Sequence, residues 1–256
     1  MSSSNLSIDL NCDVGEGQGR DEDILPFVTS ANVACGLHAG GPSTMRHAVE
    51  AAARLGVAVG AHPGFADRQN FGRTEQALSP TEIYDLVAYQ IGALEAFTRK
   101  ARIKMQHVKA HGALYHLAGR DAEVAQALAS AARETAGRPV IVGAPGTALE
   151  EAARARGLRF AAEGFADRGY QRDGSLVPRG QPGALLDADD ALVASRAVRF
   201  AAEGKVPTVS GPDLGLRVHT LCLHGDDARA PARARAIREA LTAAGLKVLA
   251  LQAWLE

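Results

Sequence analysis

Histidine ends four short apolar stretches of this 256-residue chain. The stretches end at His38, His62, His111 and His224, and a glycine lies within two residues of each histidine. Short apolar runs that stop near glycine predict buried strands. In parallel α/β folds, catalytic groups gather at the carboxyl ends of the strands. We therefore expect at least two of these histidines to line a shared site.

Carboxylates take the same kind of position after other apolar stretches. The first stretch ends at Asn11 and is followed by Asp13 and Glu16; the others are Glu163, Asp167 and Asp226. Carboxylates beside neutral histidines can act as general acid and base, or can bind a divalent metal. A metal would use Asp13, His38 and His62, although the spacing matches no compact signature such as His-Glu-x-x-His. The residues alone leave both chemistries open.

Lys109 lies two residues before His111, so both side chains are expected on one face of the strand. A lysine that enters a barrel is unfavourable unless it meets an anion. We expect Lys109 to meet carboxylates or substrate. The remaining histidines are predicted to be structural or exposed; they are His47, His107, His116 and His219.

Strand and helix patterns alternate along the whole chain, which is typical of βαβ units and a parallel sheet. Strands are expected at residues 7–11, 31–35, 57–61, 107–110, 140–143, 158–162, 216–223 and 246–251. Helices are expected at residues 21–28, 42–55, 79–100, 121–136, 147–156, 187–202 and 230–244. No linker divides the chain, so residues 1–256 are predicted to form one domain. A closed or nearly closed (β/α) barrel explains the polar strand ends, and a doubly wound open sheet is the alternative.

Composition narrows the function. A formal net charge of −1 gives no electrostatic argument for nucleic acid or an anionic membrane surface. The N-terminus lacks the pattern of a signal peptide, and no apolar stretch reaches the length of a membrane span. Three cysteines, Cys12, Cys35 and Cys222, each lie in a strand pattern, which favours a reducing cytoplasm.

The familiar nucleotide and nucleophile motifs are missing from the sequence. It has no P-loop, no Gly-x-Gly-x-x-Gly that opens a helix, and no Gly-x-Ser-x-Gly elbow. The long segment of residues 62–78 carries Arg73 and is expected to be functional. Residues 64–68 and 164–168 are the same pentapeptide, Gly-Phe-Ala-Asp-Arg, which we interpret as similar loop chemistry rather than a duplicated domain.

Taken together, these motifs resemble the LamB/YcsF family, known as the A subunit of the bacterial 5-oxoprolinase. The resembling segments are residues 9–16, 30–40, 60–65 with 71–73, 108–115, 163–170 with 176–179, and 222–226. They run in the family's order across nearly the whole chain.

The resemblance implies a fold, a reaction and partners. The implied fold is an incomplete TIM-like barrel, similar to the glycoside hydrolase/deacetylase barrels. The implied reaction is ATP-dependent opening of the lactam 5-oxo-L-proline to L-glutamate. ATP with magnesium is the implied co-substrate, held in a site shared with partner subunits B and C.

From the strand ends and the resemblance we assign two sets of residues. The expected catalytic residues are Asp13, Glu16, His38, His62, Lys109, His111, Glu163 and His224. The expected substrate-binding residues are Asn11, Arg73, Asp167, Arg168, Arg179 and Asp226. Lys109, Arg73 and the histidines would stabilise oxyanion or phosphate charge, while Asp13 or Glu16 would orient or deprotonate water.

Some positions depart from the family pattern. The segment after Glu16 is short, Gly41 stands where Asp is common, Ala110 replaces Pro, and Thr74 replaces a second Arg. Gly41 and Thr74 alter the expected charge at the site mouth and hence the expected substrate. Two alternatives remain: a metal-dependent deacetylase or amidohydrolase without ATP, and a non-catalytic lactam-binding barrel.

Overall fold

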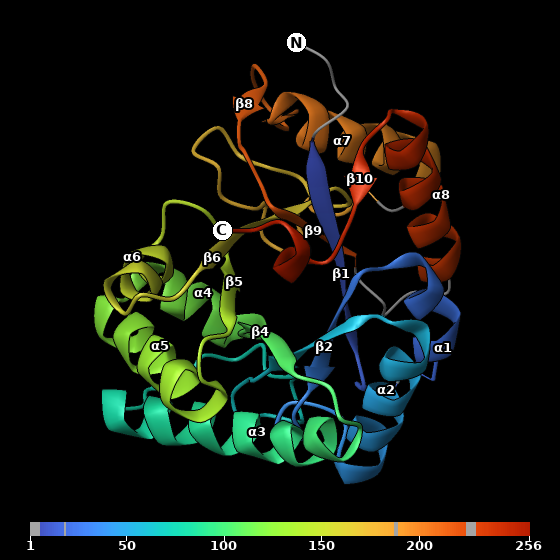
Figure 1. The fold of residues 1–256 in the computed structure, drawn as a ribbon. Coiled ribbons are helices and arrows are strands. Elements are labelled where there is room, and N and C mark those ends of the chain that lie inside the picture. The colour runs from blue at the N-terminus through green and yellow to red at the C-terminus, as the bar shows by residue number, and fades with distance from the viewer. Residues whose placement is uncertain (1–5, 18, 187–188, 224–228) are drawn as a thin grey trace.

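The computed structural model describes residues 6–17, 19–186, 189–223 and 229–256. Within these ranges seven parallel strands close into a barrel (Figure 1). The strands are β1 (Ser7–Val14), β2 (Ser30–Ala34), β3 (Ala58–His62), β4 (Met105–Lys109), β5 (Val140–Gly143), β6 (Phe160–Phe165) and β9 (Thr220–Leu223). Strand β9 pairs with both β6 and β1, which closes the sheet. This closure confirms the predicted barrel and excludes the open doubly wound sheet.

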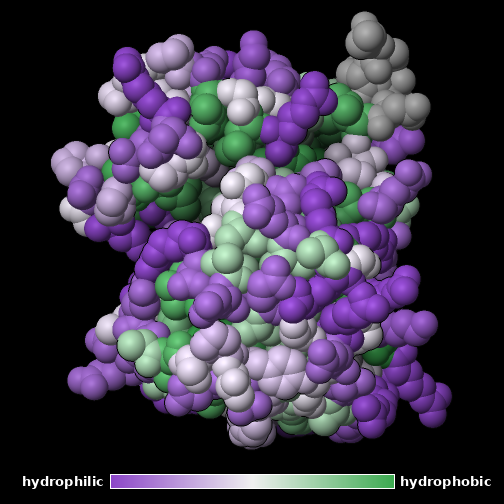
Figure 2. Space-filling view, turned by 90° about the vertical axis from the view of Figure 1, so that its left-hand side faces the viewer, coloured by the Kyte–Doolittle hydropathy of each residue, from purple (hydrophilic) through white to green (hydrophobic). Residues whose placement is uncertain are grey.

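Helices surround the strands on the outside (Figure 1). They are α1 (Asp21–Ile24), α2 (Pro42–Leu55), α3 (Pro80–Lys100), α4 (Gly112–Arg120), α5 (Ala122–Ala136), α6 (Ala148–Ala155), α7 (Asp190–Glu203) and α8 (Ala230–Ala243). Two 3₁₀ turns are η2 (Leu25–Phe27) and η3 (Leu251–Ala253). None of the helices in the described ranges is long and apolar enough to cross a membrane. On the face shown in Figure 2, hydrophilic side chains predominate.

The predicted helix starts and stops agree with local chemistry. The Ser79 side chain accepts a hydrogen bond from the backbone N–H of Glu82, and the Glu82 carboxylate accepts one from the N–H of Ser79. This reciprocal pair satisfies two N–H groups that the start of α3 leaves open. Gly56 ends α2 with φ 68°, a left-handed conformation that glycine adopts without a steric penalty.

Several elements differ from the sequence-based expectation. Helix α4 was not predicted, because glycines at positions 112 and 119 weaken the helical pattern. The expected strand at residues 246–251 shrinks to β10 (Lys247–Val248), which pairs with the start of β1. It ends there because β9 pairs with β1 from Asp9 onward. A small antiparallel pair, β7 (Lys205–Val206) with β8 (Leu214–Gly215), was also missed.

The barrel interior is unusually polar, whereas branched apolar residues fill most (β/α) barrels. Side chains alternate along β1, so Asp9, Asn11 and Asp13 enter the barrel at three successive levels. Leu10 and Cys12 face the helices and are fully buried. This arrangement makes β1 the support for a ladder of polar contacts that rises from the barrel floor to its carboxyl end.

Candidate active site

Lys109 lies at the centre of the barrel and meets two carboxylates. Its Nζ is 2.8 Å from Glu163 Oε1 and 3.2 Å from Asp13 Oδ1. It also donates a hydrogen bond to Asn11 Oδ1 at 3.2 Å. Burial alone would lower the pKa of Lys109, but the two carboxylates outweigh it and hold the pKa well above its usual value. The expectation that Lys109 meets carboxylates is thus confirmed. We call Asn11, Asp13, Lys109 and Glu163 the lysine group.

Buried amides hold this group in place. Asn11 donates to Glu163 Oε1 at 3.1 Å, and Asn32 donates to Asp13 Oδ1 at 2.8 Å. Below them, His107 Nε2 lies 2.6 Å from Asn32 Oδ1. Burial lowers the pKa of His107 to about 3, so a neutral ring donates to that amide oxygen. The structure therefore places His107 as a support beneath the site, as expected.

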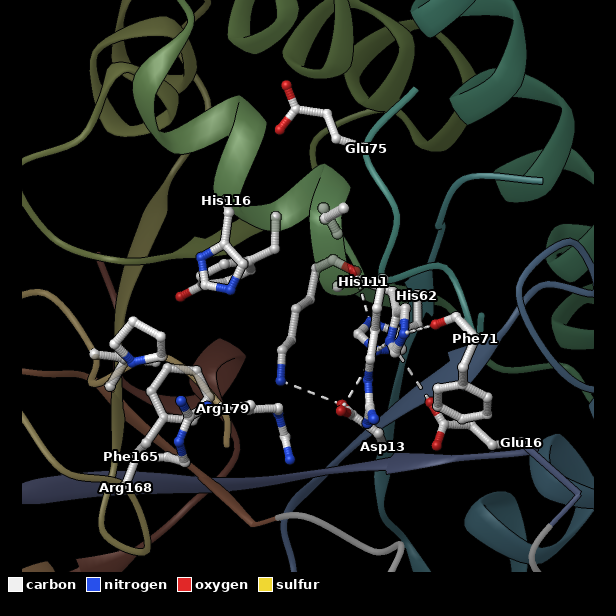
Figure 3. Close-up of a pocket in the computed structure, with 18 of the residues that line it drawn as sticks. Asp13, Glu16, His62, Phe71, Glu75, His111, His116, Phe165, Arg168 and Arg179 are labelled. Carbon is white, nitrogen blue, oxygen red and sulfur yellow. Dashed lines mark hydrogen bonds and ion pairs between the residues drawn. The ribbon is translucent and has the colours of Figure 1, made fainter. Parts of the chain in front are cut away.

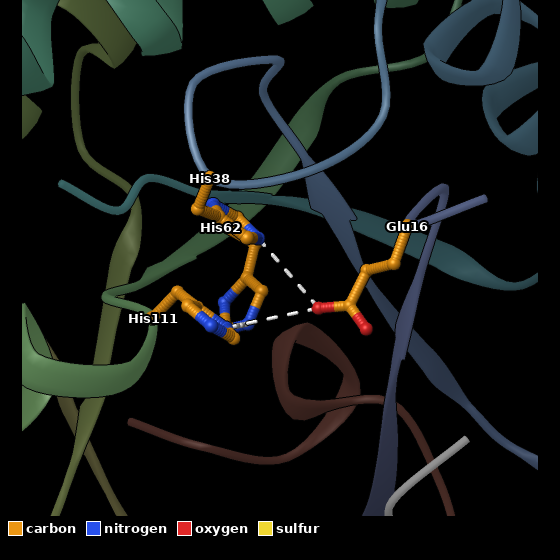
Figure 4. Close-up of side chains that lie close together, drawn as sticks. All are labelled: Glu16, His38, His62 and His111. Carbon is orange, nitrogen blue, oxygen red and sulfur yellow. Dashed lines mark hydrogen bonds and ion pairs between the residues drawn. The ribbon is translucent and has the colours of Figure 1, made fainter. Parts of the chain in front are cut away.

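A second set of polar side chains lies beside Asp13, and we call Glu16, His38, His62 and His111 the histidine group. One side-chain atom from each member lies within 4.8 Å of those from the other three (Figure 4). Glu16 Oε1 is 3.6 Å from His38 Nε2 and 3.7 Å from His111 Nδ1. His111 Nδ1 is 3.0 Å from His62 Nε2. Three of the four predicted strand-end histidines therefore come together.

Backbone carbonyls fix the orientation of two of these rings. His62 Nδ1 lies 2.8 Å from the carbonyl oxygen of Lys109, and His111 Nε2 lies 2.8 Å from that of Phe71. A carbonyl oxygen only accepts, so each of these nitrogens carries a hydrogen. When both rings are neutral, His62 Nε2 and His111 Nδ1 direct their lone pairs toward each other.

His38 is held by close packing instead. Its ring stacks on His111 with centroids 3.9 Å apart and an angle of 4° between the planes. A side chain at position 64 would lie 2.7 Å from His38 Nδ1, and one at position 72 would lie 2.7 Å from its Cβ. Glycine at both positions therefore lets the backbone approach this ring. Within the described ranges, neither ring nitrogen of His38 has a hydrogen-bond partner.

Burial keeps the rings of His38 and His111 neutral. It lowers the pKa of His38 far below the usual value, and the neighbouring His111 and His62 lower it further. Burial and the adjacent His62 lower the pKa of His111 to about 3. Near neutral pH both rings can therefore accept a hydrogen bond or ligate a cation.

The two groups open into one cavity of about 560 Å³ at the carboxyl end of the barrel (Figure 3). Asp13, Glu16, His62 and His111 lie on one side of the view, and Arg168, Arg179 and His116 lie on the other. The cavity thus offers an acid–base wall and a more cationic wall. A small polar molecule could contact both.

Some of the predicted site residues line the cavity, and others are buried behind its wall. Those that line the cavity are Asp13, Glu16, His62, Arg73, Lys109, His111, Arg168 and Arg179. Asn11, His38, Glu163 and Asp167 are buried and do not line it. His224 and Asp226 lie outside the described residues, so their assignment stays a prediction.

Arg168 has a second role that its prediction as a substrate-binding residue missed. Its Nε donates to the carbonyl oxygen of Ala184 at 2.9 Å, and its Nη2 donates to that of Val177 at 2.8 Å. The side chain therefore holds the segment that forms one cavity wall. In the matching pentapeptide, Arg68 likewise donates to two carbonyl oxygens, those of Gly36 and Gly40. The shared loop chemistry expected from the repeat is confirmed.

Several cavity residues were not predicted from the sequence. His116 was expected to be structural or exposed but lines the cavity, because it lies on the unpredicted helix α4. Tyr115 precedes it on the same helix, and its buried hydroxyl faces Glu163. Gly41 and Thr74, expected to alter charge at the site mouth, do not line the cavity. Gly41 caps α2, and the N–H of Thr74 donates to Asp67.

Fold and site together define a (β/α) barrel with a titratable cavity at the carboxyl ends of its strands. The profile of the LamB/YcsF family matches residues 8–256. The chain belongs to this family, which confirms the resemblance drawn from its motifs.

Individual relatives agree over almost the full length. The A subunit of 5-oxoprolinase from Bacillus subtilis (strain 168) is 48% identical over 251 residues, 96% of this chain and 97% of its own. The crystal structure of the "lactam utilization protein" from Thermus thermophilus superposes with a TM-score of 0.90 at 48% identity, covering 96% of this chain and all of that one. A peptidoglycan deacetylase from Bacillus subtilis shares the fold alone, with a TM-score of 0.50 at 13% identity over 99% of this chain and 91% of its own.

Proposed function

We propose that this chain is the lactam-opening subunit of an ATP-dependent 5-oxoprolinase that works with subunits B and C. The observation that carries the proposal is the cavity above Lys109, Asp13 and Glu163, in a chain whose full-length relative is named as a 5-oxoprolinase component. That relative is named as one lettered subunit, which supports partner subunits, and 5-oxo-L-proline is the proposed substrate. The three cysteines are buried and free, which supports a reducing cytoplasm.

The substrate explains why ATP is needed. A five-membered lactam is a weak electrophile, and its opening is unfavourable near neutral pH without coupling. Transfer of the γ-phosphoryl group to the amide oxygen gives an activated imidate. Water then adds to the former carbonyl carbon, the ring C–N bond breaks, and the nitrogen leaves as the protonated amine. A second water cleaves the remaining acyl phosphate to glutamate and inorganic phosphate.

The cationic side chains that line the cavity suit a phosphorylated lactam. Arg73, Arg168 and Arg179 line the cavity together with Lys109. Positive groups positioned where negative charge develops lower the barrier of such reactions. Lys109 is fixed between two carboxylates, so it can stabilise an oxyanion with little reorganisation.

The side of the cavity that carries Asp13, Glu16 and His62 supplies the acid–base groups. Asp13 is positioned by Lys109 and Asn32, and its second oxygen, Oδ2, lies 3.4 Å from His62 Nε2. We assign Asp13 the task of orienting and deprotonating water, with Glu16 as the neighbouring carboxylate. The carboxylic acid that Asp13 then becomes can return the proton to the leaving nitrogen.

ATP is assigned to a site shared with the partner subunits. The sequence contains no P-loop and no dinucleotide fingerprint. Magnesium would accompany the nucleotide phosphates there, as in other phosphoryl-transfer sites. In this scheme the cavity receives the activated lactam, and the nucleotide is bound at its mouth.

The test is glutamate release from 5-oxoproline, measured with and without ATP, for this chain alone and with subunits B and C added. ATP-dependent glutamate in the mixture only is the expected result. Glutamate from this chain alone without ATP would replace the proposal with an ATP-independent amidohydrolase. Absence of glutamate from every mixture, with all subunits folded, would contradict the proposed substrate.

The Asp13→Asn variant tests the water-activating role. Removing a general base costs about 10²- to 10⁴-fold in rate, so kcat should fall by that range while the thermal melt stays cooperative. Asp23→Asn on the exposed surface of α1 is the matched control and should retain full activity. Full activity of Asp13→Asn would exclude this role.

A further inference from the structure

The histidine group has an unusual mismatch of hydrogen-bonding groups. His62 and His111 each donate their other N–H to a backbone carbonyl, so two lone pairs meet across the 3.0 Å gap. Two acceptors at that distance repel unless a positive centre lies between or beside them.

We propose that Glu16, His38, His62 and His111 bind one divalent transition-metal ion, of the kind that imidazole ligands select, such as Zn²⁺. Imidazole nitrogens with a carboxylate oxygen form a common zinc ligand set. Magnesium is excluded from this position because it prefers oxygen ligands. The site is distinct from the magnesium that accompanies ATP, and the inference holds whatever the substrate is.

The spacing of the donor atoms fits a cation. Tetrahedral ligands about 2.0–2.1 Å from zinc lie roughly 3.3–3.4 Å from one another. The measured separations are 3.0 Å for His62 Nε2 to His111 Nδ1, and 3.6 and 3.7 Å from Glu16 Oε1 to His38 Nε2 and His111 Nδ1. All four donor atoms lie within 4.8 Å of one another, so they converge on one point after an adjustment of the side chains.

The surroundings have the features of a metal site. Metal-ligating histidines usually donate their second N–H to a carbonyl or carboxylate, which fixes the tautomer. His62 and His111 both do so, to the carbonyls of Lys109 and Phe71. The ligands come from four separate segments of the barrel mouth (Figure 4), so the closed fold brings them together.

His38 provides the independent observation. It is 1% exposed, and within the described ranges both its ring nitrogens lack hydrogen-bond partners. An unpartnered buried polar group is unfavourable, so such a group points to a missing ligand. Its ring lies parallel to that of His111, and a cation cannot lie in both planes at once. Among the described residues His38 has no hydrogen bond to lose, and it is therefore the ring that tilts when metal binds.

This ligand set differs from the one predicted from sequence, which was Asp13, His38 and His62. Asp13 is engaged by Lys109 and Asn32, although its Oδ2 remains 3.4 Å from His62 Nε2. Glu16 and His111 take its place in the group. A cation held here would polarise a lactam carbonyl or an attacking water close to Asp13.

The experiment measures metal binding directly, without an activity assay. The full chain, without a histidine tag, is stripped with a chelator and titrated with Zn²⁺, Co²⁺ and Mg²⁺ by calorimetry. Metal content is measured in parallel by elemental analysis. We expect one equivalent of Zn²⁺ or Co²⁺, a tetrahedral Co²⁺ absorption spectrum, and no Mg²⁺ at this site.

Variants assign the ligands. His38→Ala and His111→Ala should each weaken Zn²⁺ affinity by more than about 100-fold, since losing an outer partner of a ligand already costs roughly 10- to 100-fold. Glu16→Gln preserves size and should also weaken binding, which covers the case of a histidine variant that fails to fold. His47→Ala, on the exposed face of α2, is the control and should bind as the parent does.

Either of two outcomes would overturn the inference. The parent chain binds no more Zn²⁺ than His38→Ala does, or all the variants bind one equivalent with unchanged affinity. Since binding is read independently of glutamate release, a chain that binds metal but opens no lactam would sustain this inference and contradict the proposed function. A chain that opens the lactam but binds no metal would contradict this inference and sustain the proposed function.

Discussion

The lysine group and the histidine group share one cavity, but their polar atoms are matched differently. Lys109 places its ammonium group against two carboxylates and an amide oxygen, so each donor meets an acceptor. In the histidine group, acceptors face acceptors, and His38 makes no hydrogen bond among the described residues. The side chains of both groups are largely buried, so solvent exposure does not explain why their polar atoms are paired differently.

The contrast indicates that the lysine group stabilises the fold around the site, whereas the histidine group is suited to bind a cation. A buried cation that meets carboxylate and amide oxygens on several sides stabilises one arrangement of the barrel without a ligand. A buried set with unmatched acceptors is unfavourable until something positive arrives. The lysine group should therefore be sensitive to any loss of charge, whereas the apo histidine group should tolerate the loss of His38.

The largest effect is expected for Lys109→Met. The change leaves Asp13 and Glu163 buried without their cation, and breaking a buried ion pair in this way costs about 3–5 kcal/mol of unfolding free energy. Urea denaturation monitored by circular dichroism measures it. Lys104→Met, at an exposed position, is the control and should change stability by no more than about 0.5 kcal/mol.

A double variant identifies the cause of that loss. Lys109→Met combined with Glu163→Gln removes the uncompensated charge, so it should be more stable than Lys109→Met alone. If Lys109→Met unfolds at the parent's urea concentration, the lysine group does not stabilise the barrel, and the contrast with the histidine group is lost.

The barrel floor offers a second matched set, centred on Asp9, whose effect depends on pH. Burial raises the pKa of Asp9 to about 6, although hydroxyl groups of Ser30, Thr220 and Thr29 donate to its carboxylate and oppose the shift. The folded state therefore holds this proton more tightly than the unfolded chain does, whose Asp9 titrates near 3.8. The stability contributed by the protonated group is complete below about pH 4 and is lost as pH rises through about 6.

The size of this pH effect follows from the shift of about 2 pH units, which corresponds to at most about 3 kcal/mol. Asp9→Asn cannot titrate, so between pH 4 and pH 7 it should lose less unfolding free energy than the parent does. Thermal and urea unfolding across that range measure the difference. Asp85→Asn, on the exposed side of α3, should follow the parent, and an Asp9→Asn profile parallel to the parent's would exclude the raised pKa.

Much of the fold was readable because each element carried its own signal. The capping box at Ser79 and the terminal Gly56 marked real helix ends. Alternation of strands with helices predicted a parallel sheet, and the polar residues at the strand ends favoured its closure into a barrel. The prediction of strand ends from polar residues was wrong for the first strand. It was expected to stop at Asn11, but β1 continues to Val14. Polar residues normally mark a strand's end, but here they continue into a polar barrel interior.

The sequence predicted which residues belong to the site better than it predicted which of them contact one another. Strand-end position identified His38, His62 and His111, since parallel strands bring these ends together. It could not show that Glu16 rather than Asp13 joins the three histidines in one cluster, because that depends on where the chain turns after β1. The Phe71 carbonyl that orients His111 depends on a positive φ of 56° at Phe71, which no residue pattern indicates.

The smallest effect is expected within the histidine group itself. In metal-free protein, His38→Leu replaces a ring that makes no hydrogen bond to any residue the structure describes by an apolar side chain of similar size. Unfolding free energy should therefore change by no more than about 1 kcal/mol. His62→Leu is the matched comparison: it leaves the Lys109 carbonyl without its donor and should cost about 1–3 kcal/mol. Urea unfolding in the presence of a chelator measures both. An equal loss in the two variants would mean that His38 is bonded in the metal-free protein, and that the histidine group is as complete as the lysine group.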